Sequence, residues 1–466
     1  MAFSHGEPVK QETANAPSWG AVGHQMIASP RLKTILALSL PIIGGMVSQN
    51  VLNLVDTAMV GRLGNASLAA VGLASFLVFF SQAILIGLST GVQAMVARRH
   101  GAGVRKTLAE PLHAGLLIAL IGGLPIALGL HHVASELMGF LNEDEAVVEI
   151  GAGYYEVRIL AAISVGMNFC FRGYWNAVNL STIYMRTLIL MHLLNIVLNY
   201  TFIYGNFGAP ALGATGAALG TAISTVSGTA LYFFLGWKHA KSGGFLKAFP
   251  RRKVTGQLLS LSFPTGIQQL FFAGGLTTLF YIVGKVGTVE LAAANVLINV
   301  MLVGILPGIG LGLAATSLVG QAMGRQDTKD AKAWGFDVLK CGVVILAALG
   351  LPMWMFPETI IAAFIQDPQT IAVAIWPMRI SGIGLCIDAT GLILQHALFG
   401  AGDTRRTAQV AVGLQWLFFL PLAYLVGPVL GYGLIGIWAL QAFYRFIQAL
   451  LFLSMWKRER WAQITI

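Results

Sequence analysis

The stretch NLVDTAMVGRLGNASLAA, residues 53–70, is the most informative part of this chain for its fold. A single acid, Asp56, stands in an apolar run that ends at Gly61-Arg62, and a second apolar run begins after Gly64. A similar arrangement returns in the second half of the chain as LTTLFYIVGKVGTVELAA, residues 276–293. The stretch therefore marks a turn between two apolar segments, and it belongs to a unit that the chain repeats.

The composition is that of a membrane protein. Of the 466 residues, 56% are hydrophobic and only 10% are charged, whereas soluble domains carry about 25% charged residues. The short alternating segments of a β-barrel are absent from the sequence. We predict an all-α polytopic membrane protein with 12 transmembrane helices. The apolar segments lie near 33–60, 70–97, 108–130, 149–177, 182–204, 211–237, 254–284, 290–322, 332–355, 370–400, 407–427 and 431–456.

Lysine and arginine are divided unevenly between the gaps that separate these segments. The gaps on one side, taken with both termini, hold twenty-one of them, whereas the alternate gaps hold only Arg62 and Lys285. By the positive-inside rule we expect both termini in the cytoplasm. The same distribution explains the net charge of +10 without a nucleic-acid partner. We expect no cleavable signal peptide in the polar residues 1–30.

The repeat divides the chain into two halves of six segments. One constant shift places Pro41 on Pro264, and farther along a slightly shorter shift places Gly213 on Gly433. Because six is an even number, both halves start on the same side of the membrane and are related by a pseudo-two-fold axis along its normal. We therefore predict two six-helix lobes. The divisions are a cytoplasmic N-terminal segment (1–30), an N-lobe (31–237), a cytoplasmic linker (238–253), a C-lobe (254–456) and a cytoplasmic tail (457–466).

Asp56 is a carboxylate inside the first apolar segment. It lies six residues before Arg62, which is about 9 Å along a helix, and a charged side chain at membrane depth costs about 3 kcal/mol or more. An ion pair with Arg62 is disfavoured, because helix neighbours are three or four residues apart. Burial favours the protonated form of a carboxyl group. We therefore expect Asp56 to load and release a coupling ion, either H⁺ or an Na⁺ that it shares with amide oxygens.

Amide side chains are predicted to accompany this acid. The stretch HLLNIVLNY, residues 192–200, places Asn195 and Asn199 four residues apart, on one face of a helix. Asn199 lies six residues before Gly205, so its depth resembles that of Asp56. Asn53 and Asn176 are accessory candidates. Asparagine also bridges membrane helices for purely structural reasons, which is the competing interpretation.

Asp388, in GLCIDATGLILQ (384–395), is the second acid inside an apolar segment. Under the shorter shift, the one that pairs Gly213 with Gly433, it falls on Asn168, which indicates that the two lobes differ chemically at this place. We interpret Asp388 as a second coupling acid or as a counter-charge for a cationic substrate.

Signs of ATP-driven transport or of catalysis are absent from the sequence. There is no GxxxxGK[ST] pattern, no soluble domain and no nucleophile–base arrangement. The three cysteines, Cys170, Cys341 and Cys386, show neither metal-ligand spacing nor a disulfide framework. We therefore expect no enzyme activity and no resident metal or cofactor, with transport driven by an ion gradient.

Together these residues resemble the MATE (multidrug and toxic compound extrusion) family over essentially residues 31–456. The resemblance is carried by Pro41, VDTAMVGRLGNASLAAVG (55–72), VARRHGAG (96–103), LNIVLNY (194–200), LGATGAALGTAIS (212–224) and DATGLILQHALFGAGDTRR (388–406).

The resemblance implies a V-shaped, two-lobed fold and the efflux of cationic or amphiphilic drugs in exchange for H⁺ or Na⁺. It implies that Asp56 is the coupling residue, with Asn195 and Asn199 as the matching polar pair and Asp388 as the matching acid of the tenth span. NorM-type members carry a glutamate in the seventh span, where this chain has Ala273. This departure favours H⁺ coupling at Asp56, as in DinF-like members.

Two transport functions fit these observations, a multidrug/H⁺ antiporter and a flippase of lipid-linked precursors from the same superfamily. Flippases usually have more spans and a strongly cationic central cavity. Here most Lys and Arg lie in the gaps, and Arg158, Arg172, Arg379 and Lys340 are predicted near segment ends, which disfavours a large anionic headgroup. We expect small-molecule drugs and membrane lipid as partners, and a functional monomer because one chain supplies both lobes.

Overall fold

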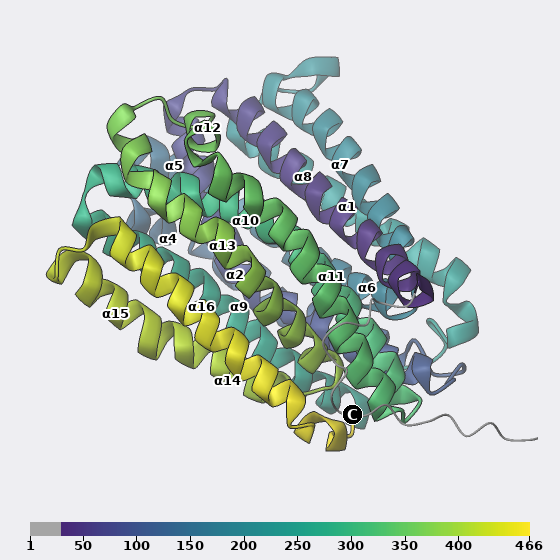
Figure 1. The fold of residues 1–466 in the computed structure, drawn as a ribbon. Coiled ribbons are helices and arrows are strands. Elements are labelled where there is room, and N and C mark those ends of the chain that lie inside the picture. Colours follow the sequence, from purple (N-terminus) through teal and green to yellow (C-terminus); the bar gives the residue numbers. More distant parts are fainter. Residues whose placement is uncertain (1–28) are drawn as a thin grey trace, which may run out of the picture.

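The structure, a computed structural model, describes residues 29–466, so the predicted N-terminal segment 1–30 lies almost entirely outside the described residues. Long helices run side by side across the molecule (Figure 1), and residues 29–466 contain no β-strand. The helices of the first half are α1 (Ser29–Gly61), α2 (Asn65–Gly101), α3 (Glu110–His132), α4 (Ala134–Leu141), α5 (Glu145–Leu160), α6 (Ala162–Ala177), α7 (Ser181–Tyr204) and α8 (Gly213–His239).

The second half follows the same order. The eleventh span of the chain consists of α14 and α15, and each of these two helices is followed by π-helical turns, at 414–419 and 425–429. The helices of this half are α9 (Arg252–Val286), α10 (Thr288–Gly324), α11 (Thr328–Met355), α12 (Pro357–Ala362), α13 (Pro368–Gly400), α14 (Thr404–Gly413), α15 (Leu420–Tyr424) and α16 (Gly433–Lys457).

The prediction of an all-α membrane protein with twelve spans in two lobes is confirmed. Eleven helices within the described residues are long and apolar enough to cross a membrane. The remaining predicted span, near 149–177, is formed by α5 and α6, which are separated only by Ala161. There the Ala161 N–H bonds to the Arg158 carbonyl, three residues back, and this tighter turn interrupts the helix without a proline.

The helix ends reproduce the repeat and correct one detail of it. The shift that pairs Pro41 with Pro264 also carries both ends of α2 onto those of α10, and both ends of the α5–α6 pair onto those of α13. The shorter shift begins to apply only at α8 and α16. Asp388 of α13 therefore corresponds to Val165 in the N-lobe. The predicted match with Asn168 was wrong because it applied the shorter shift too early in the chain.

The lobes meet through repeat-related helix pairs, α2 with α9 and α1 with α10, and through α2 with α10 near the middle of the molecule. At one end the crossing of α2 and α10 requires glycine. A Cβ on Gly101 would lie 1.9 Å from the Gln321 carbonyl oxygen, and a Cβ on Gly324 would lie 2.0 Å from the Arg98 carbonyl oxygen. Any larger residue would force these backbones apart at this crossing.

Burial along α2 and α10 shows which end of the lobe interface is closed. In α10 every residue from Gly310 to Met323 is buried, and in α2 nearly every residue from Leu85 to Ala97 is buried. The amino-terminal halves of both helices contain many exposed or half-exposed residues. The lobes are therefore packed together near Gly101 and Gly324 and separate toward the opposite end.

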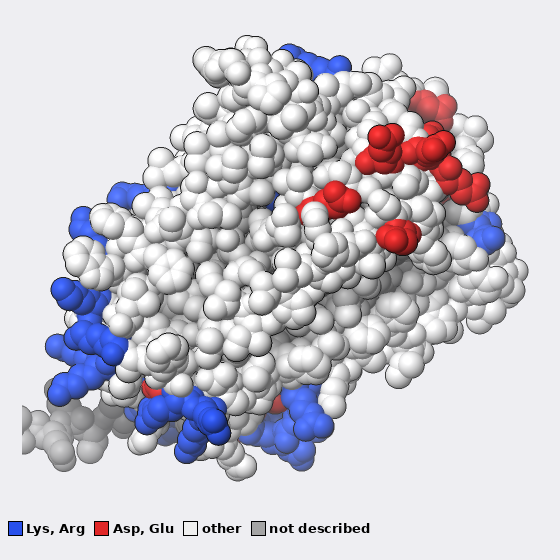
Figure 2. Space-filling model, turned by 180° about the vertical axis from the view of Figure 1, so that it is seen from behind, with Lys and Arg blue, Asp and Glu red and all other residues white. Residues whose placement is uncertain are grey.

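Charge is segregated along the helix axes. Figure 2 shows most of the visible lysines and arginines at one end of the molecule and a cluster of acidic residues at the opposite end. The closed crossing at Gly101 and Gly324 is immediately followed in sequence by basic gaps, which contain Arg105 and Arg325. On the topology expected from the sequence, the closed end of the lobe interface faces the cytoplasm.

The linker is docked on the N-lobe. It runs from the end of α8 to Arg251, which precedes α9. Arg251 donates to the Glu110 carboxylate from Nε at 2.8 Å and from Nη2 at 2.9 Å. Phe245 packs against the rings of Phe171 and His113. These contacts hold the start of the C-lobe against α3.

Candidate functional site

Asp56 and the predicted asparagine pair come together between α1 and α7. Asn199 Nδ2 donates to Asp56 Oδ1 at 2.8 Å. Asn195 and Asn199 are almost completely buried, whereas Asp56 is partly exposed. The helix spacing that placed both amides on one face of α7 therefore directs them toward the acid of α1.

The Asn195 amide lies between Asp56 and α8. Its terminal atom that faces α1 lies 3.1 Å from Asp56 Oδ1, and its other terminal atom lies 3.0 Å from Thr221 Oγ1. With the amide nitrogen toward α1, Asn195 donates to an ionised Asp56. With the amide oxygen toward α1, it accepts a hydrogen bond from a protonated Asp56. The same geometry therefore accommodates both protonation states through a rotation of one amide group.

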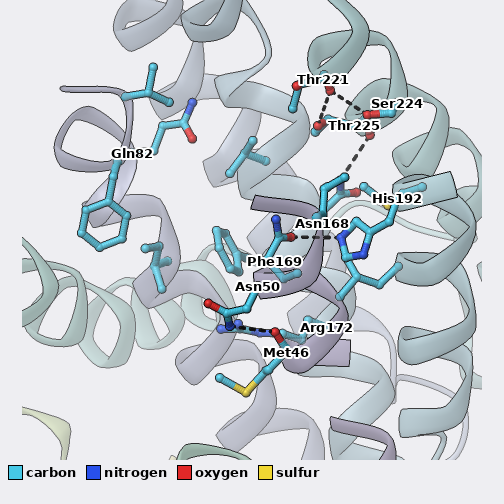
Figure 3. Close-up of a pocket in the computed structure, with 18 of the residues that line it drawn as sticks. Met46, Asn50, Gln82, Asn168, Phe169, Arg172, His192, Thr221, Ser224 and Thr225 are labelled. Atoms are coloured by element: carbon cyan, nitrogen blue, oxygen red, sulfur yellow. Dashed lines mark hydrogen bonds between the residues drawn. The ribbon is translucent and has the colours of Figure 1, made fainter. Parts of the chain in front are cut away.

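A cavity of about 440 Å³ lies beside this network, lined by N-lobe residues together with Leu306 of α10 (Figure 3). Its wall includes apolar side chains such as Phe79, Phe169 and Met191. Thr221 and Ser224, which are hydrogen-bond partners of Asn195, also line it. A volume in the range of small-molecule sites, with mostly apolar walls and a few polar groups, suits an amphiphilic ligand.

Two arginines face this cavity, contrary to the sequence-based interpretation that placed them near segment ends. Arg158 is near the end of α5, but the break at Ala161 places that end in the cavity wall and not at the membrane surface. Arg172 of α6 donates from Nε to Ser89 Oγ at 3.0 Å, and its guanidinium lies over the Phe169 ring. The cavity is therefore more cationic than the sequence suggested.

Comparisons with known proteins assign this chain to a family. A family model described as MatE matches residues 41–201 and 264–425. The chain belongs to the MatE family. The two matches begin at the repeat-related prolines Pro41 and Pro264, so the MatE model recognises each lobe separately and supports the repeat found in the sequence.

The MatE relatives cover almost the whole chain. The chain is 28% identical over 426 residues to the "Probable multidrug resistance protein NorM" of Synechococcus sp., covering 88% of this chain and 90% of the relative. It is 26% identical to the "Multidrug resistance protein NorM" of Aliivibrio fischeri, with 84% and 86% covered. A solved structure titled "Outward-facing conformation of a multidrug resistance MATE family transporter of the MOP superfamily" superposes with a TM-score of 0.84 at 24% identity, covering 93% of this chain and 97% of that one. The MatE fold is thereby established.

Asp388, the predicted acid of the tenth span, lies in the other lobe of this MatE protein. It is buried, and its Oδ1 lies 3.7 Å from Arg445 Nε of α16. Arg445 also donates to Gln448. Asp388 therefore already has a cationic partner, which the sequence analysis did not identify, and it does not join the Asp56 network.

The two accessory candidates lie apart from the hydrogen bonds around Asp56. Asn53 is exposed and accepts a hydrogen bond from Gln49. Asn176 is fully buried at the end of α6, where its backbone carbonyl accepts from Ser317 of α10. The structure thus places Asn176 at the interface between the lobes, because α6 runs from the cavity toward the closed crossing.

Sequence reasoning missed the cavity residues Arg158, Arg172 and His192. Arg158 and Arg172 lie in one apolar segment, nearly four helical turns apart, a spacing that would have placed them on similar faces. His192 is the first residue of the stretch HLLNIVLNY, in which only the two asparagines were predicted to be functional. Its ring contacts Ser48 Oγ at 3.0 Å and Gln49 Oε1 at 3.1 Å, which ties α7 to α1 beside the cavity.

Proposed function

We propose that this MatE protein is a multidrug efflux antiporter that exports amphiphilic drugs, cationic ones included, in exchange for H⁺ by alternating access. The observation that carries the proposal is the contact of Asp56 with Asn199 and Asn195 beside an N-lobe cavity. The names of the NorM relatives support drug efflux. We place the protein in a bacterial inner membrane, as a monomer with both termini in the cytoplasm.

The coupling step is a change of hydrogen-bond direction. When Asp56 is ionised, it accepts from Asn199, and from Asn195 with the amide nitrogen toward α1. When Asp56 takes up a proton, one acceptor position becomes a donor, and Asn195 rotates so that its oxygen faces α1. Because Asn195 also contacts Thr221 and Ser224 of the cavity wall, the rotation changes the surface that a drug meets. A drug cation and the proton then compete for the same negative charge.

The experiment is drug efflux in proteoliposomes with the pH gradient and the Na⁺ gradient imposed separately. Ethidium is the probe, and wild type is compared with Asp56→Asn and with Asp388→Asn. Under a pH gradient we expect wild type to transport and Asp56→Asn to lose nearly all transport, because asparagine is isosteric but cannot bind a proton. Transport driven only by Na⁺, or an unimpaired Asp56→Asn variant, would contradict the assignment.

Sodium coupling is the alternative that the same residues support. Asp56 with the oxygens of Asn195, Asn199 and Thr221 supplies the hard donors that Na⁺ prefers. The flippase alternative is favoured by a different observation, the pair Arg158 and Arg172 in the cavity. If the protein does not transport ethidium under either gradient but does move lipids across the bilayer, the flippase alternative is favoured.

A further inference from the structure

Arg158 is a charged side chain whose hydrogen-bonding capacity is partly unused. Its Nε and Nη1 atoms are inaccessible to solvent, and no hydrogen-bond partner for them occurs among residues 29–466. Buried guanidinium N–H groups without a partner cost substantial free energy, because the water removed from them has not been replaced. Nη2 of Arg158 is not among these inaccessible atoms, and Arg158 lines the cavity, so a partner that enters the cavity would meet the guanidinium at Nη2.

Among residues 29–466, no close carboxylate neutralises these two arginines. Within the described part of the chain, neither Arg158 nor Arg172 forms an ion pair with an acidic side chain. Asp56 is close enough to Arg158 to interact with it electrostatically, but the two groups are not in contact as a pair. Arg445 of the C-lobe differs in this respect, because it lies 3.7 Å from Asp388.

Both arginines open onto the same apolar space. The cavity of about 440 Å³ contains both side chains together with Phe79 and Phe169. The Ser89 hydroxyl fixes Nε of Arg172, and Tyr184 lies beside its guanidinium. Guanidinium groups bind carboxylates and related oxyanions through paired N–H donors, and they do so most strongly where water is excluded.

We propose that Arg158 and Arg172 form an anion subsite that takes the carboxylate, or a similar oxyanion, of an amphiphilic ligand whose apolar body fills the N-lobe cavity. The subsite extends the proposed function, since it assumes that this cavity is the substrate site, but it does not depend on which ion drives transport. The oxyanion belongs either to a water-soluble organic acid or to the phosphate of a membrane lipid.

The test is a binding measurement without any ion gradient. Wild-type protein in phosphatidylcholine nanodiscs is titrated calorimetrically with 2-naphthoate and with 2-naphthamide, which share one ring system and differ in charge. We expect the carboxylate to bind more tightly than the amide. Arg158→Gln and Arg172→Gln should each weaken naphthoate binding roughly tenfold to a hundredfold, since hydrogen bonds to charged groups are the strong ones. Both variants should bind naphthamide as wild type does, which shows that the cavity is intact.

Arg379→Gln is the matched control. Arg379 is also an arginine within a membrane helix, it lies over the Trp376 ring of α13, and it does not line this cavity. This variant should retain the naphthoate preference, and Arg158→Lys should retain part of it because the charge is kept.

A competition experiment separates the two sources of the oxyanion, a water-soluble organic acid and a membrane lipid. Short-chain phosphatidylglycerol and short-chain phosphatidylcholine are each tested as soluble competitors of naphthoate. Displacement of naphthoate by phosphatidylglycerol alone identifies an anionic lipid as a ligand, and displacement by both lipids identifies a lipid phosphate in general, since phosphatidylcholine carries a phosphate too. Displacement by neither lipid identifies an organic acid.

The subsite is overturned if wild type binds the two naphthalene probes equally or binds neither. It is equally overturned if the naphthoate preference survives in both Arg158→Gln and Arg172→Gln, because Arg158 would then serve only as a distant counter-charge for Asp56. Loss of H⁺ coupling in the efflux experiment leaves these binding results unaffected, so the two proposals fail separately.

Discussion

At the level of single residues, the position of Asn199 depends on the absence of a side chain opposite it. A Cβ added to Gly220 of α8 would lie 2.3 Å from Asn199 Oδ1. Gly220 therefore allows α8 to pass so close to α7 that the Asn199 amide is pressed toward α1, where its nitrogen reaches Asp56. The acid and the amides were visible in the sequence, but the glycine that positions them was one of many.

Gly220→Ala should impair transport without removing any polar group. The added methyl must displace the Asn199 side chain, and overpacking of this kind costs about 1–3 kcal/mol. We expect the initial rate of ethidium efflux under a pH gradient to fall by roughly fivefold to a hundredfold. Gly72→Ala is the control, because a Cβ there meets no atom within 4 Å. Equal rates for the two variants at equal protein levels would refute the role assigned to Gly220.

At the level of helices, the crossing of α2 and α10 closes one end of the molecule. The repeat places Gly101 and Gly324 in equivalent positions, so the same close approach is made twice across the pseudo-two-fold axis. Polar contacts reinforce it, since Gln93 of α2 donates to the Leu313 carbonyl at 2.6 Å and to Ser317 Oγ at 2.8 Å. A state that opens this end must break these buried contacts.

Gly101→Ala should weaken the closed state. The methyl group cannot occupy a position 1.9 Å from a carbonyl oxygen, so the helices must separate. The probe is a cysteine at the buried position Ala97, in a background where the three native cysteines are replaced by serine. A membrane-impermeant maleimide, added on the side of the basic gaps, should react with this cysteine about tenfold faster in Gly101→Ala than in the protein that keeps Gly101. Gly122→Ala, a change into open space on α3, should leave the rate as it was. An unchanged rate in Gly101→Ala would mean that this crossing does not control access.

At the level of the whole molecule, segments between and beyond the lobes are fixed by basic side chains. Arg251 and Arg99 both bind Glu110, so the linker is tied to the N-lobe. The Glu110 carboxylate raises the pKa of Arg251, which therefore remains charged at every pH at which the protein is stable. Near the C-terminus, Arg98 of the N-lobe donates to the Ile464 carbonyl at 2.6 Å, and the Trp461 ring stacks on the Trp456 ring. Linker and tail thus join the lobes at their closed end.

Arg251→Gln should release the linker. Because Arg251 is largely exposed, we expect little change in overall stability, as is typical of surface ion pairs. Limited trypsin digestion should cut at Lys247 several-fold faster than in wild type, since local opening becomes less costly. Arg252→Gln is the control, because it also removes one tryptic site. Within residues 29–466 Arg252 has no carboxylate partner, so the linker of this variant should be cut at the wild-type rate. Equal cleavage of both variants would show that the Glu110 contact does not restrain the linker.

The fold class, the repeat and part of the candidate site could be predicted from the sequence alone. Hydropathy is local and cumulative, so the apolar runs identified the spans, and the helical period placed Asn195 and Asn199 on one face of α7. A lone acid in an apolar run, such as Asp56, is costly enough to be noticed without coordinates.

What those residues face became known only when the helices were packed together. The break at Ala161 has no proline to announce it, yet it is what places Arg158 in the wall of a cavity. The pairing of Asp388 with Arg445, the location of Asn176 at the lobe interface and the contact between Gly220 and Asn199 all join residues from different helices. Such contacts depend on how helices pack and where they cross, and a hydrophobic pattern along one chain carries no information on which neighbour each polar face will meet.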